Sequence, residues 1–333
     1  MKKTLLILFV ALANLVNGQH YSNIVFEGAG IRGIAYSGVV SELDARGIRS
    51  EFQHVAGTSA GAITALLFSL GYTGEEMEQI ISSTKFQQFN DGKWLVFGGI
   101  YRMKNKFGYY RGERFAEFIG QLVANKTGDA NATFSDLRQQ GYPNLYVTGT
   151  CLNKQTLTVF SVESYPEMKV KDAVRISMSI PLYFEAVLID EYGNVVSDPD
   201  DPAAYDDYVD GGLTGNFPIW IFDNDAECEG GNPKTLGVRI DSSEQIKQDQ
   251  LDQTLIQLPI YSFDTYISAL YLYIIENLNR PPLTETHWTN TISVSSVGIG
   301  PKIKKLSFEE KSRLVTSGKT AATAFLGQTT EEE

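Results

Sequence analysis

The chain has 333 residues, of which 43% are hydrophobic and 20% are charged. This is ordinary globular composition with enough length for a sizeable core, and it excludes disordered, collagenous and coiled-coil proteins. The 28 basic and 40 acidic residues give a net charge of −12, which argues against nucleic acid as a partner because an acidic surface repels phosphates. Three histidines and two cysteines, Cys151 and Cys228, are too few for a multi-histidine metal site or a disulfide framework. Their number does not decide whether the two cysteines pair.

The first 18 residues have the pattern of a secretory signal peptide. A basic start, Met1-Lys2-Lys3, precedes an apolar segment from Leu5 to Val16 and the small and polar residues Asn17-Gly18-Gln19. The apolar segment is shorter than the roughly 20 residues that span a bilayer. The alternative is a buried first strand or helix. We expect cleavage near Gly18, a secreted or periplasmic location, and a single domain over residues 19–333.

Beyond the signal segment, strand and helix patterns alternate. Hydrophobic periodicity gives the elements, and glycines or capping boxes such as Thr73 with Glu76 give their ends. In chain order we predict a strand at 24–26, a helix at 34–46, a strand at 54–56, helices at 60–70, 73–83 and 111–126, strands at 145–150 and 157–160, a helix at 170–179, strands at 207–209 and 235–240, and helices at 251–278 and 307–325. This alternation indicates a mainly parallel sheet covered on both faces.

The segment Gly28-Ala29-Gly30-Ile31-Arg32-Gly33 lies between the first predicted strand and the first predicted helix. It has the spacing of a dinucleotide-binding loop, and such a loop directs backbone N–H groups at an anion. A dinucleotide site also needs an acidic residue at the end of the second strand, to hold the ribose. Gly57-Thr58 stands there instead, and Glu51 precedes that strand. A dinucleotide is therefore the weaker alternative.

A second motif, Gly57-Thr58-Ser59-Ala60-Gly61, follows the strand at 54–56 and opens an apolar helix. This is the context of a nucleophile elbow, in which a sharp turn between small residues exposes a serine hydroxyl at a helix N-terminus. The alternative is an ordinary helix start capped by Ser59. The strand–turn–helix context favours Ser59 as a nucleophile, with Gly57 and Gly61 as the small residues of the elbow.

A serine nucleophile needs a base, and the sequence offers two kinds. His20 lies at the edge of the signal segment and His54 in the strand that leads to Ser59, so His287, ahead of a late strand, is the remaining histidine candidate. The other candidate is Asp210, which begins the motif Asp210-Gly211-Gly212 after the strand at 207–209. An ordinary Asp-Gly turn is the alternative for this motif.

The ordered set of GAGIRG, GTSAG and DGG motifs resembles the patatin-like phospholipase family over about residues 21–222, and the segments 174–184 and 307–311 agree with it. The resemblance implies a three-layer α/β/α fold with a mainly parallel central sheet. It also implies a Ser-Asp dyad without histidine, in which Asp210 accepts the proton of Ser59 as the serine attacks a lipid ester carbonyl. The glycine-rich loop would be the oxyanion hole, with no metal and no cofactor. Its residues in this sequence are Gly28, Ala29, Gly30 and Arg32.

Two residues depart from the family's pattern. Glu27 stands where aspartate is usual, and Ala29 stands where glycine is usual. An alanine still donates its N–H but must tolerate the backbone angles of the loop.

Together, the motifs and the resemblance predict a serine lipid acyl hydrolase of the phospholipase A type that works through an acyl-enzyme. A non-catalytic lipid-binding protein is the alternative.

One segment, residues 85–114, differs from the acidic chain around it. It holds seven basic residues against two acidic ones, interleaved with aromatic residues. Such a mixture suits the interface of a membrane with anionic headgroups, whereas the alternative is a connecting loop with a solvated cationic face. The helix predicted at 251–278 is interpreted as core-facing because Ile267, Leu270, Tyr271, Ile274 and Leu278 form one stripe.

Overall fold

A computed structural model describes residues 20–92, 95–223, 230–251, 254–277, 283–300 and 305–328. The predicted signal peptide, Cys228 and Leu278 therefore lie outside the described residues, and the interpretations that rest on them remain predictions. Cys151 is buried in the sheet. Within the described residues, no helix combines the length and hydrophobicity needed to cross a membrane.

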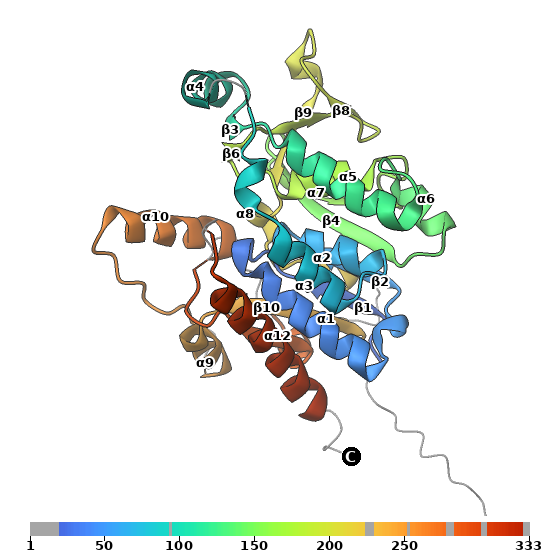
Figure 1. Ribbon diagram of the computed structural model, residues 1–333, viewed down its shortest axis with the longest axis vertical. Coiled ribbons are helices and arrows are strands. Elements are labelled where there is room, and N and C mark those ends of the chain that lie inside the picture. The colour runs from blue at the N-terminus through green and yellow to red at the C-terminus, as the bar shows by residue number, and fades with distance from the viewer. Residues whose placement is uncertain are drawn as a thin grey trace, which may run out of the picture.

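The described residues form a nine-stranded central sheet (Figure 1). Five parallel strands, in the spatial order β11, β10, β1, β2 and β4, make up one part, and antiparallel strands continue the sheet from both edges of β4. The strands are β1 (Asn23–Phe26), β2 (His54–Gly57), β4 (Asn144–Cys151), β5 (Thr156–Phe160), β7 (Val187–Ile189), β8 (Val195–Val196), β9 (Asp206–Asp210), β10 (Thr235–Asp241) and β11 (Thr291–Ser295). A separate parallel pair joins β3 (Gly108–Tyr110) to β6 (Leu182–Phe184).

Helices lie on both sides of this sheet, so the predicted α/β/α fold is confirmed (Figure 1). The helices are α1 (Ala35–Arg46), α2 (Ala60–Ser69), α3 (Gly74–Ser83), α4 (Leu95–Asn105), α5 (Glu113–Thr127), α6 (Phe134–Gln139), α7 (Val170–Ser177), α8 (Gly212–Gly215), α9 (Ser243–Leu251), α10 (Phe263–Tyr271), α11 (Glu285–Thr289) and α12 (Phe308–Gln328). Short turns of 3₁₀ helix include η1 (Gly30–Ile34), η3 (Phe86–Phe89) and η5 (Ile219–Phe222), and η6 (Leu272–Asn277) is a π-helix.

The core divides at the sheet because successive strand side chains point to opposite faces. Ile24 and Phe26 of β1 belong to the larger cluster, which α1, α2 and α12 help to cover. Val25, between them, packs with Ala56, Phe217 and Ile219 on the other face. After their polar first residues, Asn23 and His54, the short β1 and β2 are buried on both faces, which explains why the rest of each strand is apolar.

The helix ends marked by the sequence are confirmed at several places. Thr73 and Glu76 form the capping box of α3, with Thr73 Oγ1 accepting the Glu76 N–H at 3.1 Å. Ser307 and Glu310 exchange equivalent bonds at the start of α12. Gly47 ends α1 with a φ of 72°, the left-handed conformation that glycine adopts without strain.

The single helix predicted at 251–278 is wrong. The chain there forms the end of α9, an irregular stretch, the nine-residue α10 and then η6. Leu270 and Ile267, which the helical periodicity placed toward the core, are 42% and 40% exposed. Periodicity identifies an apolar face but does not say what covers it.

Candidate active site

Ser59 occupies the sharp turn between β2 and α2, as the elbow motif predicts. Its φ of 53° and ψ of −121° lie in a region that non-glycine residues rarely adopt and that costs roughly 1–3 kcal/mol. The Ser59 N–H donates to Ser177 Oγ at 2.8 Å, which fixes the turn. The Ser59 hydroxyl lies at the N-terminal end of α2 and points to Met178 Sδ, 3.6 Å away.

The two elbow glycines are required by close backbone contact. A Cβ at Gly57 would lie 2.2 Å from the Gly61 carbonyl oxygen, and a Cβ at Gly61 would lie 2.2 Å from the Phe26 carbonyl oxygen. These partners are backbone atoms of β1 and α2, which cannot move aside singly. The glycines therefore allow α2 to start directly against the end of β1.

We expect Gly61→Ala to lower the free energy of unfolding by about 1–3 kcal/mol, because the added methyl group must push β1 and α2 apart. Gly327→Ala in α12 is the matched control, since its Cβ meets nothing within 4 Å. Urea unfolding of both variants measures the difference. Equal stability of the two variants would show that the elbow tolerates a side chain at Gly61.

Strand register brings Asp210 to Ser59. Val147 of β4 pairs with Gly57 of β2, and Gly149 pairs with Asp210 of β9. Both partners lie on the same edge of β4, because β5 occupies the other edge at these positions. Since β9 is antiparallel to β4 and β2 is parallel to it, the carboxyl ends of β2 and β9 meet head to head along this edge.

Asp210 is 1% exposed, at the end of β9. Its Oδ1 accepts the Gly212 N–H at 2.8 Å, whereas its buried Oδ2 has no hydrogen-bond partner among the described residues. Burial raises the pKa of the Asp210 carboxyl to about 7, against smaller lowering effects of the Gly212 N–H and the Ser59 hydroxyl. One carboxyl oxygen is thus fixed by the Gly212 N–H, and the carboxyl group lies close enough to the Ser59 hydroxyl for the serine to lower its pKa.

The glycine-rich loop presents backbone N–H groups at the start of η1. The Gly28 N–H donates to the Asn216 carbonyl oxygen at 3.0 Å, and the Arg32 N–H donates to the Ala29 carbonyl oxygen at 3.2 Å. Among the described residues, the N–H groups of Ala29, Gly30 and Ile31 have no such partner. These three are the orphan donors of a helix start, and Ile31 was not singled out from the sequence.

The backbone angles of the loop show that an alanine fits at position 29. Ala29 has a φ of −134°, a value open to alanine, whereas Gly30 has the left-handed φ of 54°. Alanine is therefore accommodated without strain. The buried Arg32 side chain donates from Nε to the Ala29 carbonyl oxygen at 3.1 Å, so it holds the loop from inside and its guanidinium is not presented to solvent.

Asn216 is a further residue of the site that the sequence analysis missed. Its Nδ2 donates to the Gly28 carbonyl oxygen at 2.9 Å, and its side chain packs where a Cβ of Gly28 would stand. Thr58 Oγ1, similarly, bonds to Thr148 Oγ1 and to the Gly215 carbonyl oxygen. These bonds tie the segment after Asp210 to both glycine motifs. No local sequence signal marks them, because they join residues 90 to 188 positions apart.

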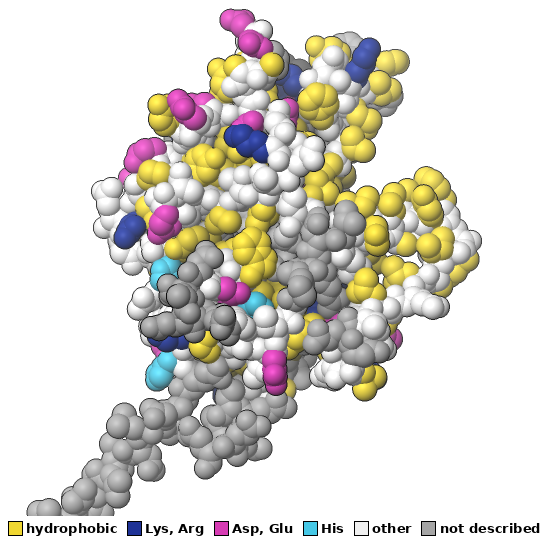
Figure 2. Space-filling view, turned by 180° about the vertical axis from the view of Figure 1, so that it is seen from behind, with side chains coloured by type: hydrophobic (Ala, Val, Ile, Leu, Met, Phe, Trp, Pro, Cys, Tyr) yellow, Lys and Arg dark blue, Asp and Glu magenta, His cyan; other side chains and the backbone are white. Residues whose placement is uncertain are grey.

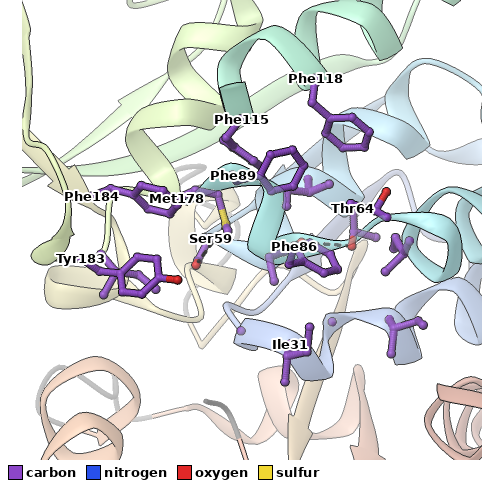
Figure 3. A pocket seen from close by; sticks show the side chains of 18 of the residues that line it. Ile31, Ser59, Thr64, Phe86, Phe89, Phe115, Phe118, Met178, Tyr183 and Phe184 are labelled. Carbon is purple, nitrogen blue, oxygen red and sulfur yellow. Dashed lines mark hydrogen bonds between the residues drawn. The ribbon is translucent and has the colours of Figure 1, made fainter. Parts of the chain in front are cut away.

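A largely apolar pocket opens beside Ser59 (Figure 3). Met178, Tyr183 and Phe184 lie on one side of the serine, and aromatic rings of η3 and α5 lie on the other. Figure 3 shows these rings, Phe86, Phe89, Phe115 and Phe118, pointing into the pocket. No acidic or basic residue lines it in the described part of the chain, so its chemistry favours a hydrocarbon chain over a charged group.

The three histidines lie elsewhere. His54 begins β2, at the opposite end of that strand from Ser59, and contacts Asn23 Oδ1 at 3.0 Å. His287 is buried in α11, with Nε2 2.9 Å from Asp223 Oδ2, and His20 contacts Glu51. None of them lines the pocket at Ser59.

Segment 85–114 has features of both interpretations given above, a membrane interface and a connecting loop. Phe86 and Phe89 face the pocket, whereas Phe97, Tyr101 and Phe107 are exposed. Its cations differ as well: Arg102 is buried and donates to the Tyr109 carbonyl oxygen, and Lys106 pairs with Asp198. Exposed cationic residues of the segment include Lys85, Lys104, Arg111 and Arg114.

A serine in a strained strand–turn–helix elbow, close to a buried carboxyl group and to N–H groups without backbone partners, is the arrangement expected of a serine hydrolase on an α/β fold. The sequence comparison gives the family: residues 24–223 match the profile described as patatin-like phospholipase. The chain belongs to the patatin-like phospholipase family, which places it among lipid hydrolases.

The chain is also similar to several curated proteins and to a solved structure. The chain is 28% identical to uncharacterized protein R571 of Acanthamoeba polyphaga mimivirus over 77% of each chain. It is 33% identical to uncharacterized protein YqhO of Bacillus subtilis, over 61% of this chain and 67% of that one. The probable lipid hydrolase 463L of invertebrate iridescent virus 6 is 25% identical, over 61% of this chain and 63% of that one. The crystal structure of VipD from Legionella pneumophila shares the fold, with a TM-score of 0.59 and 17% identity over 93% of this chain and 67% of that one.

Proposed function

We propose that this protein cleaves acyl ester bonds of phospholipids, as a phospholipase A-type enzyme that uses Ser59 and Asp210 as a dyad. The observation that carries this proposal is the buried Asp210 carboxyl, which interacts with the hydroxyl of the strained Ser59, a residue that lines an apolar pocket. A relative named as a probable lipid hydrolase supports the substrate class.

The proposed reaction has two halves. In the first, the Asp210 carboxylate takes the proton of Ser59 as the serine oxygen attacks the ester carbonyl. The N–H groups of Ala29, Gly30 and Ile31 stabilise the resulting oxyanion. Asp210 then gives the proton to the departing alcohol, which leaves an acyl-enzyme. In the second half, Asp210 takes a proton from water, hydroxide attacks the acyl group, and the proton returns to Ser59.

The pocket supports an acyl chain as the part of the substrate that is bound. Its lining of isoleucine, phenylalanine and methionine side chains removes a hydrocarbon from water. A pyrophosphate would meet no charged partner there, and no acidic residue ends β2 for a ribose. The dinucleotide alternative therefore has no support from this site.

Covalent labelling tests the proposal against the non-catalytic lipid-binding alternative. We expect a fluorophosphonate to label the purified protein at Ser59, as read by peptide mass spectrometry, and phosphatidylcholine micelles to release fatty acid. The Ser59→Ala variant should show neither reaction. A folded protein that binds lipid but takes no label would instead be a lipid-binding member of the family.

We further propose that the exposed cations of segment 85–114 attract anionic lipid headgroups. Lys104→Glu combined with Arg111→Glu should weaken binding to vesicles containing phosphatidylglycerol, most strongly at low salt. The expected contribution is about 1 kcal/mol per charge near the surface, measured by vesicle sedimentation. Hydrolysis of a soluble short-chain ester should remain unchanged. Binding that is independent of salt, or equal loss of both activities, would contradict this role.

A further inference from the structure

The region around α10 exposes an unusual number of large apolar side chains. We call these residues the α10 surface: Leu258, Ile260, Tyr261, Phe263, Tyr266, Ile267, Leu270 and Tyr273. Tyr261 and Phe263 are 81% and 80% exposed, and Asp264 is the single charged residue between positions 254 and 275. An exposed apolar patch of this kind marks a contact with a partner or a lipid surface.

The chain holds the α10 surface in a defined position. Gln245 of α9 accepts the Ile256 N–H at 2.9 Å and donates to the Thr254 carbonyl oxygen at 2.8 Å. Ser262 and Thr265 form the capping box that starts α10. Asp249, next to Gln245 on α9, pairs with the buried Arg239 of β10 at 2.8 Å. The exposed side chains are thus presented by an anchored segment.

This surface also adjoins the catalytic region. The π-helix η6 continues α10 and packs against α8, the short helix directly after Asp210. A second apolar projection, on α4, packs against β3, whose partner β6 carries Tyr183 and Phe184 of the pocket. Figure 2 shows α4 and α10 as two hydrophobic projections on the same side of the molecule.

We propose that the α10 surface inserts into the boundary between headgroups and acyl chains of a lipid aggregate, and so brings the Ser59 pocket to its substrate. The inference rests on the proposed function, because it takes the aggregate to contain the substrate. Tyrosine and phenylalanine are the residues that suit this boundary, where one end of the side chain is apolar and the other wet. Because the surface is almost uncharged, it requires no anionic lipid.

A vesicle experiment tests this docking separately from catalysis. The Ser59→Ala protein is mixed with phosphatidylcholine vesicles, which carry no net charge, and binding is measured by flotation at low and at 1 M salt. The test variant adds Tyr261→Asp and Phe263→Asp. The matched control adds Tyr192→Asp, at a tyrosine that is 66% exposed in the turn between β7 and β8.

We expect the double substitution to lower the vesicle partition coefficient at least about tenfold, with little dependence on salt, and the control to bind like the parent. In the Ser59 background, the double variant should hydrolyse a soluble short-chain ester at the parental rate. Unchanged vesicle binding would overturn the proposal. The proposal would also be overturned if light scattering showed a dimer that the double substitution dissociates while vesicle binding persists. The α10 surface would then be the interface between two copies of the chain. Vesicle binding by a protein without esterase activity would leave docking intact and defeat only the proposed function.

Discussion

Ser59→Ala and Asp210→Asn should each lower kcat by at least about 10³, and the double variant should be little worse than either single one. A nucleophile and its base act as one unit, so losing either removes the same step. Asp210→Asn keeps the shape of the side chain and the acceptor of the Gly212 N–H, but it replaces the free Oδ2 with an amide that cannot accept the Ser59 proton. The measurement is steady-state hydrolysis of a soluble ester.

Histidine variants provide the control for this result. His54→Gln and His287→Gln should keep most of the activity, because neither side chain lines the Ser59 pocket. Circular dichroism must show that each variant is folded, since His287 is buried against Asp223. If His287→Gln abolished hydrolysis while Asp210→Asn were mild, the base would be the histidine and the Ser-Asp assignment would be wrong.

The pH dependence of kcat/KM should report the ionisation of Asp210. Because burial raises the pKa of this carboxyl to about 7, the group is protonated below that pH and cannot accept the Ser59 proton. We therefore expect kcat/KM to fall about tenfold per pH unit below 7 and to level off above it. A profile that stays flat down to pH 5, with the protein still folded, would show that no such group controls the reaction.

The same ionisation should appear in stability. The pKa of Asp210 is higher in the folded protein than the value near 3.9 of an unfolded chain, so its protonation stabilises the fold at low pH and that contribution is lost as pH rises through about 7. Asp210→Asn removes the buried charge, and we expect a higher Tm than that of the parent at pH 8. This difference should shrink toward pH 5. A variant less stable than the parent at pH 8 would contradict the raised pKa.

Much of the site can be predicted from sequence because its motifs are local. A serine flanked by Gly57 and Gly61, between an apolar strand and an apolar helix, encodes its own turn, and the structure shows the strained φ of Ser59 and the close contacts of both glycines. The capping boxes at Thr73 and Ser307 are equally local. The departure at Ala29 could not be judged in this way, because backbone angles decide that the left-handed residue is Gly30.

The helix predicted at 251–278 shows where a local pattern fails. An apolar periodicity states that one face avoids water, but only the packing of other elements decides whether the face is buried. Here Phe263, Tyr266, Ile267 and Leu270 of α10 are exposed within the described part of the chain. The sequence pattern does not show which elements cover this face, so periodicity alone does not predict that the face lies in the core.

By itself, the sequence determined the alternation of strands and helices, the elbow serine, the glycine-rich loop and Asp210 as a candidate. Only the tertiary structure decided that Asp210 comes within reach of Ser59, although 151 positions separate them in the chain. The reason is strand register: β9 runs antiparallel along the edge of β4 that β2 occupies, so the two strands end facing one another. Asn216 and Thr58 then tie the segment after Asp210 to both glycine motifs. Such long-range contacts depend on how the sheet is assembled and leave no mark on neighbouring residues.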